Sequence, residues 1–280
     1  MVQTGNTVMM PGPLHGPELH TKMTIDNSTT RFSNRVANYV RFRPSYPPEV
    51  LRSLTDDFGL RSDHLVADIG SGTGIFTELL LDAGHTVYAV EPNTAMRDAA
   101  EQRLAHLSNF RSVHGTAEAT TLPDHSVDWL VAAQAFHWFD VDRFREEALR
   151  ILRPPSMAAI LWNNRREDTP FLAAYETFLH EFAIDYAKVK HQNAEADGRI
   201  PRFFKDGPFV RRGFTNAQDC NFDALKGRTL SASFMPSAEH PRYETMIESL
   251  GRLFDQHARN GKVTIEYETC MYVAKAAYGA

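Results

Sequence analysis

Residues 65–74 read Leu-Val-Ala-Asp-Ile-Gly-Ser-Gly-Thr-Gly, and this stretch decides the fold. The apolar run over residues 64–69 is typical of a buried strand in a parallel sheet. The spaced glycines that follow open a predicted helix over residues 75–83. A strand that ends in glycines and leads into a helix brings backbone N–H groups close to a ligand at the positive end of that helix. The stretch therefore predicts a ligand-binding strand, turn and helix.

Strand and helix signals alternate along the next eighty residues. The predicted strands cover residues 86–90, 127–133 and 157–162, and the predicted helices cover residues 93–105 and 141–152. Strands separated by helices of about ten to fifteen residues are typical of βαβ units with right-handed crossovers. The pattern predicts an α/β fold built on a doubly wound, mostly parallel sheet.

The periodicity is weaker after residue 163. Asp168-Thr169-Pro170 is a good helix start, and the aromatic residues over 171–182 lie at helical spacing, which is typical of a core-facing side. The alternative for this row is that its exposed end lines an apolar pocket. A second amphipathic helix is predicted over residues 243–259 and a final strand over 262–273, whereas 192–208 have no clear period. Arg165-Arg166 is expected to be solvated. His240 and Tyr243 are expected either to face a substrate or to lie on the surface.

Length and composition indicate one folded domain. The chain has 280 residues, of which 42% are hydrophobic and 23% charged, close to the average of globular proteins. The first thirty residues are rich in Gly, Pro, Thr and Asn, and we expect a flexible arm over 1–30. We expect a single domain over 31–280, with a core over 60–163 plus C-terminal strands and a helical cap over 164–213 and 225–260.

Charge and cysteine usage disfavour several classes of function. The net charge is −5 and the pI about 6.2, so no basic field is present for nucleic acid or an anionic membrane. No signal peptide and no apolar run of the roughly 18 residues that a membrane helix requires are visible. The two cysteines form no CxxC motif, and the histidines form no HExxH motif. We expect a cytoplasmic protein without a metal site.

The glycine loop excludes two common phosphate-binding motifs. The dinucleotide fingerprint GxGxxG would need glycine at position 75 or 77, and the GxxxxGK[ST] loop is absent. The remaining pattern is D-x-G-x-G-x-G, followed by Glu91 at the end of the next strand. A carboxylate at that point can accept hydrogen bonds from a ribose diol. The expected ligand therefore carries a ribose and does not need a pyrophosphate.

With these residues in place, the chain resembles the class I S-adenosylmethionine-dependent methyltransferases, specifically the small-molecule branch with a methyltransferase-11-like core. The resemblance extends from Phe32 to the C-terminus and is most specific over residues 66–162. It implies a seven-stranded, Rossmann-like methyltransferase fold and S-adenosylmethionine as the cofactor. The implied cofactor-binding residues are Tyr39, Arg43, Asp68, Gly70, Ser71, Gly72, Gly74, Glu91, Pro92, Met96, Thr116, Ala117, Glu118 and Gln134.

The resemblance also implies roles within this set. The first motif, from Asp68 to the glycines, would hold the methionine part of the cofactor, and Met96 would pack on the adenine. Many relatives have Asp where Thr116 stands, so the Ala117 N–H is the expected partner of the adenine edge. Arg43 would pair with the methionine carboxylate, with a salt bridge inside the first helix as the alternative. The stretch 226–234 recurs in similar proteins without an assigned role.

His137 is the candidate catalytic base. It lies just beyond a predicted strand end, where doubly wound sheets bind their ligands, and imidazole suits proton transfer near neutral pH. The alternative is that His137 and Trp138 only shape the pocket wall or form hydrogen bonds with the cofactor. Gln134 is expected to touch the methionine portion, with a plain role at the strand end as the alternative.

The resemblance implies methyl transfer by in-line displacement to O, N or C of a small organic metabolite. The alternatives are a non-catalytic S-adenosylmethionine-binding protein and a methyltransferase that acts on a protein or RNA. Nucleic-acid amino methyltransferases usually carry an (Asp/Asn/Ser)-Pro-Pro-(Tyr/Phe) motif where this chain has residues 133–136, Ala-Gln-Ala-Phe. The expected partner is therefore a small-molecule acceptor rather than a nucleic acid or a membrane, and the arm and cap suit a homodimer.

Overall fold

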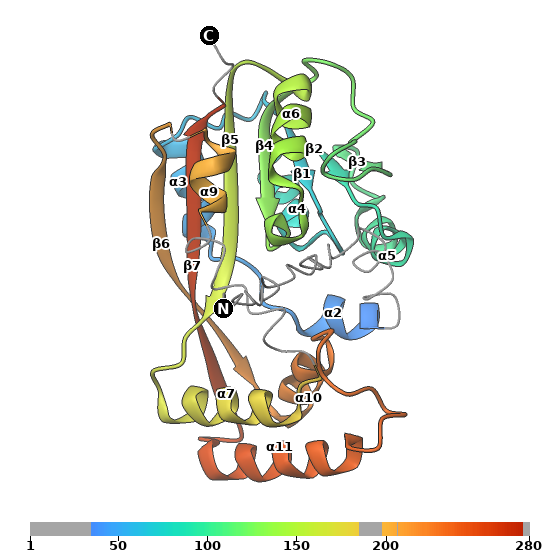
Figure 1. Cartoon of the computed structure of the whole chain (residues 1–280), viewed down its shortest axis with the longest axis vertical. Coiled ribbons are helices and arrows are strands. Elements are labelled where there is room, and N and C mark those ends of the chain that lie inside the picture. The colour runs from blue at the N-terminus through green and yellow to red at the C-terminus, as the bar shows by residue number, and fades with distance from the viewer. Residues whose placement is uncertain (1–34, 185–197, 206, 277–280) are drawn as a thin grey trace, which may run out of the picture.

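The strands form one sheet in the order β3-β2-β1-β4-β5-β7-β6 (Figure 1). The computed structural model describes residues 35–184, 198–205 and 207–276, so the predicted arm over 1–30 lies outside the described residues. The strands are β1 (Leu65–Ile69), β2 (Thr86–Val90), β3 (Phe110–Val113), β4 (Val127–Ala133), β5 (Leu152–Arg165), β6 (Val210–Cys220) and β7 (Val263–Lys275). The first five strands pair in parallel, and β7 lies antiparallel between β5 and β6. This confirms the predicted doubly wound, mostly parallel seven-stranded sheet.

Helices cover both faces of the sheet and continue beyond one end of it. Their bounds are α2 (Val36–Phe42), α3 (Pro48–Asp56), α4 (Ile75–Asp82), α5 (Thr94–Leu104), the short 3-10 helix η2 (Phe136–Trp138), α6 (Val141–Ile151), α7 (Pro170–Phe182), α9 (Arg199–Phe203), α10 (Phe222–Leu230) and α11 (Tyr243–His257). The caps agree with the sequence signals, because Asn93 accepts a hydrogen bond from the Met96 N–H at the start of α5 and Thr169 accepts one from the Leu172 N–H at the start of α7.

Alternation along the strands divides the core into two layers. In β1, Val66 packs with α3, α4 and α5 on one face, whereas its neighbour Ala67 packs with α6 and α9 on the other. Successive side chains of a strand point to opposite faces, so a strand covered on both sides is apolar throughout. The continuous apolar runs in the sequence follow from this double coverage.

The helices α7, α10 and α11 form a cap with its own hydrophobic core. Figure 1 shows them gathered beyond the end of the sheet toward which β5, β6 and β7 extend. Ile265 and Tyr267 of β7 and Cys220 of β6 are buried among the apolar residues of these helices. The aromatic row over residues 171–182 belongs to this core, as its helical spacing predicts.

Three strands differ from the sequence prediction. Strand β5 runs from Leu152 to Arg165 rather than over 157–162, and β3 and β6 occupy segments to which the periodicity assigns no strand. β6 is an edge strand whose residues are mostly exposed, so it lacks the apolar run that reveals a buried strand. Among the described residues, no helix is long and apolar enough to cross a membrane.

Candidate active site

One cavity opens where the carboxyl ends of β1, β2 and β4 meet α2 and the cap. Its volume is about 250 Å³, close to the size range of small-molecule sites. Ligands of doubly wound sheets bind at this edge. The wall combines the turns after the strands with side chains from α2, α7, α10 and β7.

The glycine loop brings two strand ends into close contact. Gly70 and Gly72 have φ angles of +69° and +57°, which L side chains rarely adopt. A Cβ on Gly70 would lie 2.6 Å from the Cβ of Ala135, so glycine is required for the turns after β1 and β4 to approach each other. The loop backbone is thereby exposed to the cavity at its narrow end.

Glu91 joins this loop to the end of β2. Its carboxylate accepts hydrogen bonds from the N–H groups of Gly72, at 2.9 Å, and Asn93, at 2.8 Å. The side chain is buried, and burial raises the pKa of Glu91, while those two N–H groups act in the opposite direction. Each carboxylate oxygen keeps a further lone pair, so Glu91 can also accept hydrogen bonds from a ribose diol.

Several buried polar atoms of the loop lack a partner among the described residues. These are Oδ1 of Asp68, Oγ of Ser71 and Oγ1 of Thr73, and all three residues line the cavity. The other Asp68 oxygen accepts a hydrogen bond from Thr77 at 2.6 Å. Burial raises the pKa of Asp68 to about 7, and the Glu91 carboxylate adds to the rise. Buried polar atoms are normally satisfied, so these atoms indicate a polar ligand.

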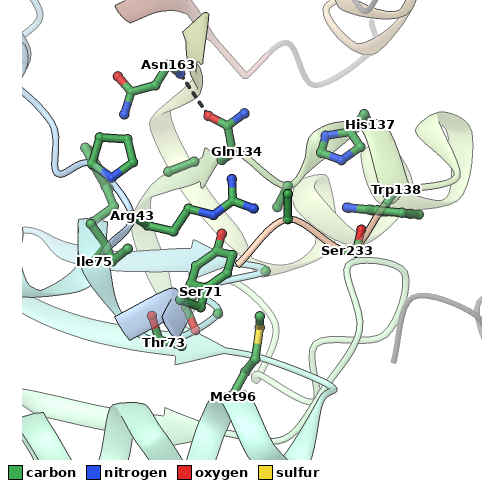
Figure 2. Close-up of a pocket in the computed structure, with 18 of the residues that line it drawn as sticks. Arg43, Ser71, Thr73, Ile75, Met96, Gln134, His137, Trp138, Asn163 and Ser233 are labelled. Atoms are coloured by element: carbon green, nitrogen blue, oxygen red, sulfur yellow. Dashed lines mark hydrogen bonds between the residues drawn. The ribbon is translucent and has the colours of Figure 1, made fainter. Parts of the chain in front are cut away.

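The wall next to Glu91 fits an adenine ring. Met96 is buried at the start of α5, and its sulfur lies near Gly72 in the cavity wall (Figure 2). Thr116 and Ala117 line the same region, and the Glu118 carboxylate accepts a hydrogen bond from the Asp140 N–H at 2.9 Å. These residues fit the expected cofactor. Glu91 supplies an acid for the ribose, Met96 supplies an apolar side chain for the base, and Thr116 and Ala117 supply a backbone edge for it.

Gln134 connects the ends of β4 and β5. Its φ is +59°, and its side-chain oxygen accepts a hydrogen bond from the Asn163 N–H at 2.9 Å, as Figure 2 shows. A non-glycine residue in the left-handed region is strained and is often found at functional sites. Since the oxygen is engaged, the amide nitrogen of Gln134 is the group available to a ligand.

Arg43 extends into the cavity from the end of α2. Figure 2 shows its guanidinium in the space that Gln134 and Ser71 border. The guanidinium lies over the Tyr39 ring, 4.7 Å from its centroid, and one terminal nitrogen donates to the Ser231 carbonyl at 3.2 Å. Burial, with the nearby Arg228 second, lowers the pKa of Arg43 to about 10. Arg43 forms no salt bridge inside α2, and its Nε has no partner among the described residues, which favours the expected carboxylate ligand.

His137 and Trp138 lie on η2, directly after β4. Both line the cavity, and their rings lie 4.9 Å apart (Figure 2). Arg199 of α9 donates to the carbonyls of Phe136, at 3.3 Å, and Phe139, at 2.5 Å. These hydrogen bonds hold the backbone of η2 in place and so keep His137 at the cavity wall.

The cavity wall contains every predicted site residue except Gly74. Gly74 is the N-cap of α4 at a φ of +81°, and a Cβ there would lie 2.6 Å from Leu104. Glycine is therefore required at position 74 because α4 packs against α5 there, and not because the residue contacts the cavity. The described residues contain no cluster of His, Cys, Asp or Glu that could hold a metal ion.

Sequence reasoning assigned no site role to most residues on the cap side of the cavity, namely Asn163, Asn164, Arg165, Glu167, Arg228, Ala232, Ser233, Phe234 and Tyr267. Four of these residues lie in the stretch 226–234, which recurs in similar proteins. That recurrence was a signal in the sequence, although no role was assigned to the stretch. Tyr175 and Leu179 also line the cavity, and they belong to the helix whose aromatic row has a pocket wall as its alternative role. The expectation that Arg165 is solvated is wrong, because Arg165 is partly buried and forms an ion pair with Glu176. His240 and Tyr243 do not line the cavity, and His240 accepts a hydrogen bond from the Arg242 N–H.

Comparisons with known proteins agree with this geometry. The family model described as "Methyltransferase domain" matches residues 67–160. An uncharacterized methyltransferase of Mycobacterium tuberculosis is 40% identical over 136 residues, which cover 49% of this chain and 53% of that protein. An uncharacterized methyltransferase-like protein of Schizosaccharomyces pombe is 31% identical over 156 residues, covering 55% of this chain and 59% of that protein. The chain thus spans about half the length of the curated relatives it matches.

A solved structure extends the likeness of the fold beyond the matched segment. A proposed type II methyltransferase from Anaeromyxobacter dehalogenans aligns with a TM-score of 0.60 and 22% identity, covering 84% of this chain and 98% of that one. At this identity the likeness shows the fold alone. The matched family, the sequence relatives, the seven-stranded sheet and the glycine loop with Glu91 together lead to one conclusion. Residues 67–160 match a methyltransferase domain, and the sheet, the glycine loop and Glu91 around this segment fit a class I S-adenosylmethionine-dependent methyltransferase.

Proposed function

We propose that this protein transfers the methyl group of S-adenosylmethionine to a small organic molecule. The observation that carries the proposal is the single cavity that reaches from the glycine loop to the cap. One side of it is lined by Ser71, Gly72 and Glu91, and the other by Tyr175 and Phe234. Two ends with different chemistry suit two ligands held side by side.

The cofactor supplies an electrophilic methyl group on its sulfonium sulfur. In this proposal, Glu91 accepts hydrogen bonds from the ribose hydroxyls, and Met96 packs against the adenine. Arg43 pairs with the methionine carboxylate, and the Gln134 amide donates to the same end. Each of these residues lines the cavity, and the glycine loop lets the backbone approach the ligand closely.

The acceptor occupies the cap side in this proposal. An in-line displacement requires the accepting atom, the methyl carbon and the sulfur to be aligned in a site that excludes water. The buried cap core under Tyr175 and Leu179 provides a rigid roof for that purpose. Where the acceptor is an alcohol or a phenol, the His137 imidazole takes its proton as general base, since His137 lies in the cavity wall on η2.

Transfer of a tritium-labelled methyl group tests this function. The full chain is incubated with labelled S-adenosylmethionine and with separated small-metabolite, protein and RNA fractions. We expect label to appear in the small-metabolite fraction. Label confined to protein or RNA would contradict the small-molecule acceptor. Binding of the cofactor without label in any fraction would favour a non-catalytic binding protein.

A further inference from the structure

The cap end of the cavity differs in chemistry from the end near the glycine loop. Its wall includes Tyr175 and Leu179 of α7, Arg228 of α10, Phe234, and Tyr267 of β7. None of these residues belongs to the glycine loop, to the turn after β2 or to the turn after β4. A ligand at this end would therefore contact the cap rather than the groups that fit the cofactor.

The charged side chains at this end are not all paired with one another. Arg165 pairs with Glu176, so these two buried charges cancel, and Glu167 adds another carboxylate to the wall. Arg43 and Arg228 contribute two further guanidinium groups, and they lie close enough for Arg228 to lower the pKa of Arg43. Arg43 is assigned to the cofactor, so Arg228 is the guanidinium of the cap end that forms no ion pair with a carboxylate of the described residues.

Arg228 has no counter-ion in the described part of the chain. Its Nε donates one hydrogen bond, at 3.3 Å, to the Tyr267 hydroxyl. No carboxylate among the described residues pairs with it, and its two terminal nitrogens donate to none of those residues. A guanidinium presents its donors in a fixed fork that matches the oxygens of a carboxylate or a phosphate. A charge held away from water is stabilised when an opposite charge binds to it.

The neighbouring hydroxyl adds a donor to the same place. The Tyr267 hydroxyl accepts from Arg228, so its own proton remains available to a ligand. Tyr175 differs, because Thr229 donates to the Leu225 carbonyl and must therefore accept the proton of Tyr175, at 2.8 Å. Arg228 and Tyr267 together present donors, and donors select an acceptor-rich group.

The cofactor offers one carboxylate for two arginines. Its methionine end has one carboxylate, which Arg43 is placed to bind beside Ser71 and Gln134 (Figure 2). Arg228 projects from α10 in the cap, with Tyr267 as its neighbour. An anion for Arg228 is therefore expected from the other ligand.

We propose that the methyl acceptor is a small organic anion whose carboxylate or phosphate group binds the terminal nitrogens of Arg228 and the hydroxyl of Tyr267. Leu179 and Phe234 contact the apolar part of this acceptor. The proposal deepens the methyl transfer proposed above and rests on it. A neutral analogue would leave the guanidinium without its partner, so the site discriminates strongly by charge.

Binding of matched small probes tests the proposal. The full chain is saturated with S-adenosylhomocysteine and titrated calorimetrically with benzoate, phenyl phosphate and benzamide, which share a ring and differ in charge. We expect at least one acid to bind about tenfold or more tightly than benzamide. The comparison of benzoate with phenyl phosphate identifies the preferred acidic group.

Substitutions then assign the preference to Arg228. Arg228→Gln should abolish the preference for the acid, and Arg228→Lys should keep part of it because the charge remains. Arg252→Gln is the matched control, since Arg252 is exposed on α11 outside the cavity. Should Arg228→Gln fail to bind S-adenosylhomocysteine, Tyr267→Phe takes its place, and a reduced preference is the expected result.

Three results would overturn the proposal: equal binding of benzamide and both acids, no detectable binding of either acid to the saturated protein, or an acid preference that survives Arg228→Gln. Binding of S-adenosylhomocysteine is measured first in the same samples. Its absence in the unmodified protein would contradict the proposed function, whereas its presence without an acid preference would contradict the anionic acceptor alone.

Discussion

The Glu91 carboxylate holds the turns after β1 and β2 together by accepting the Gly72 and Asn93 N–H groups. Substitution by glutamine preserves the shape of the side chain but replaces one oxygen by an NH₂ group. That group cannot accept a backbone N–H or a ribose hydroxyl. We expect Glu91→Gln to weaken S-adenosylmethionine binding about tenfold or more, by about 1.4 kcal/mol or more, in a calorimetric titration. Glu49→Gln, at an exposed position on α3, is the control, and equal affinities of the two variants would contradict the role of Glu91.

The raised pKa of Asp68 predicts that the stability of the cofactor-free protein depends on pH. Burial raises its pKa to about 7 from an ordinary value of 3.8, so between these values the folded state binds more protons than the unfolded state. The contribution of Asp68 to the free energy of unfolding is therefore largest below pH 4, and it is lost as the pH rises through about 7. Asp68→Asn cannot ionise, so we expect this variant to gain stability relative to the unmodified protein between pH 5 and pH 8. Urea unfolding at both pH values measures the gain, and a constant difference would refute it.

Residues that lie close together in the sequence could be predicted, and those brought together from distant segments could not. Asp68, Gly70 and Gly72 occur in one loop, and Glu91 follows the next strand, so their spacing alone indicates a ribose-bearing ligand. Arg228 reaches the same cavity from a helix more than a hundred residues further along. Its sequence neighbourhood carries no periodic signal for a cavity, because the convergence is set by the packing of the cap.

At the scale of elements, the contact between α2 and α10 positions Arg43. Gly227 lies in α10 against the Phe42 ring of α2, and a Cβ at Gly227 would lie 2.1 Å from that ring. We expect Gly227→Ala to separate the two helices, to lower the free energy of unfolding by about 1–3 kcal/mol and to weaken cofactor binding, because Arg43 follows α2. Urea unfolding and calorimetric titration measure the two effects.

Gly251→Ala is the matched control for this contact. Gly251 also lies inside a helix, α11, but the nearest atom to its added Cβ would be 3.9 Å away. Alanine is favoured over glycine by about 0.5–1 kcal/mol in such a position, so this variant should be as stable as the unmodified protein or more so. Equal effects of the two substitutions would mean that the Phe42 contact does not position α2.

The elements themselves were predictable to different degrees. β2 and β4 have the predicted bounds because both are buried on two sides and read as apolar runs. β6 was missed because it pairs with β7 on one side only and alternates partly buried with exposed residues. Its place depends on β7, which lies more than forty residues later in the chain, and local sequence holds no information on that pairing.

In the whole molecule, β7 links the cap to both layers of the sheet. It contributes Tyr267 to the cap core, Met271 to one face of the sheet and Tyr272 to the other. We therefore expect the cap and the sheet to unfold together. The three tryptophans, Trp129, Trp138 and Trp162, lie in or directly after strands of the sheet, so fluorescence reports on the sheet, whereas hydrogen exchange of α11 amides reports on the cap. Coincident urea midpoints are the predicted outcome, and loss of α11 protection before the fluorescence change would show an independent cap.

The central claim is that the cavity holds S-adenosylmethionine against Glu91. Calorimetric titration of the full chain with S-adenosylmethionine, with NAD as the control ligand and with Glu91→Gln in parallel, tests it directly. The account predicts one site for S-adenosylmethionine, weakened by the substitution, and no binding of NAD. Binding of NAD in preference to S-adenosylmethionine, or binding of S-adenosylmethionine that is indifferent to Glu91→Gln, would contradict it.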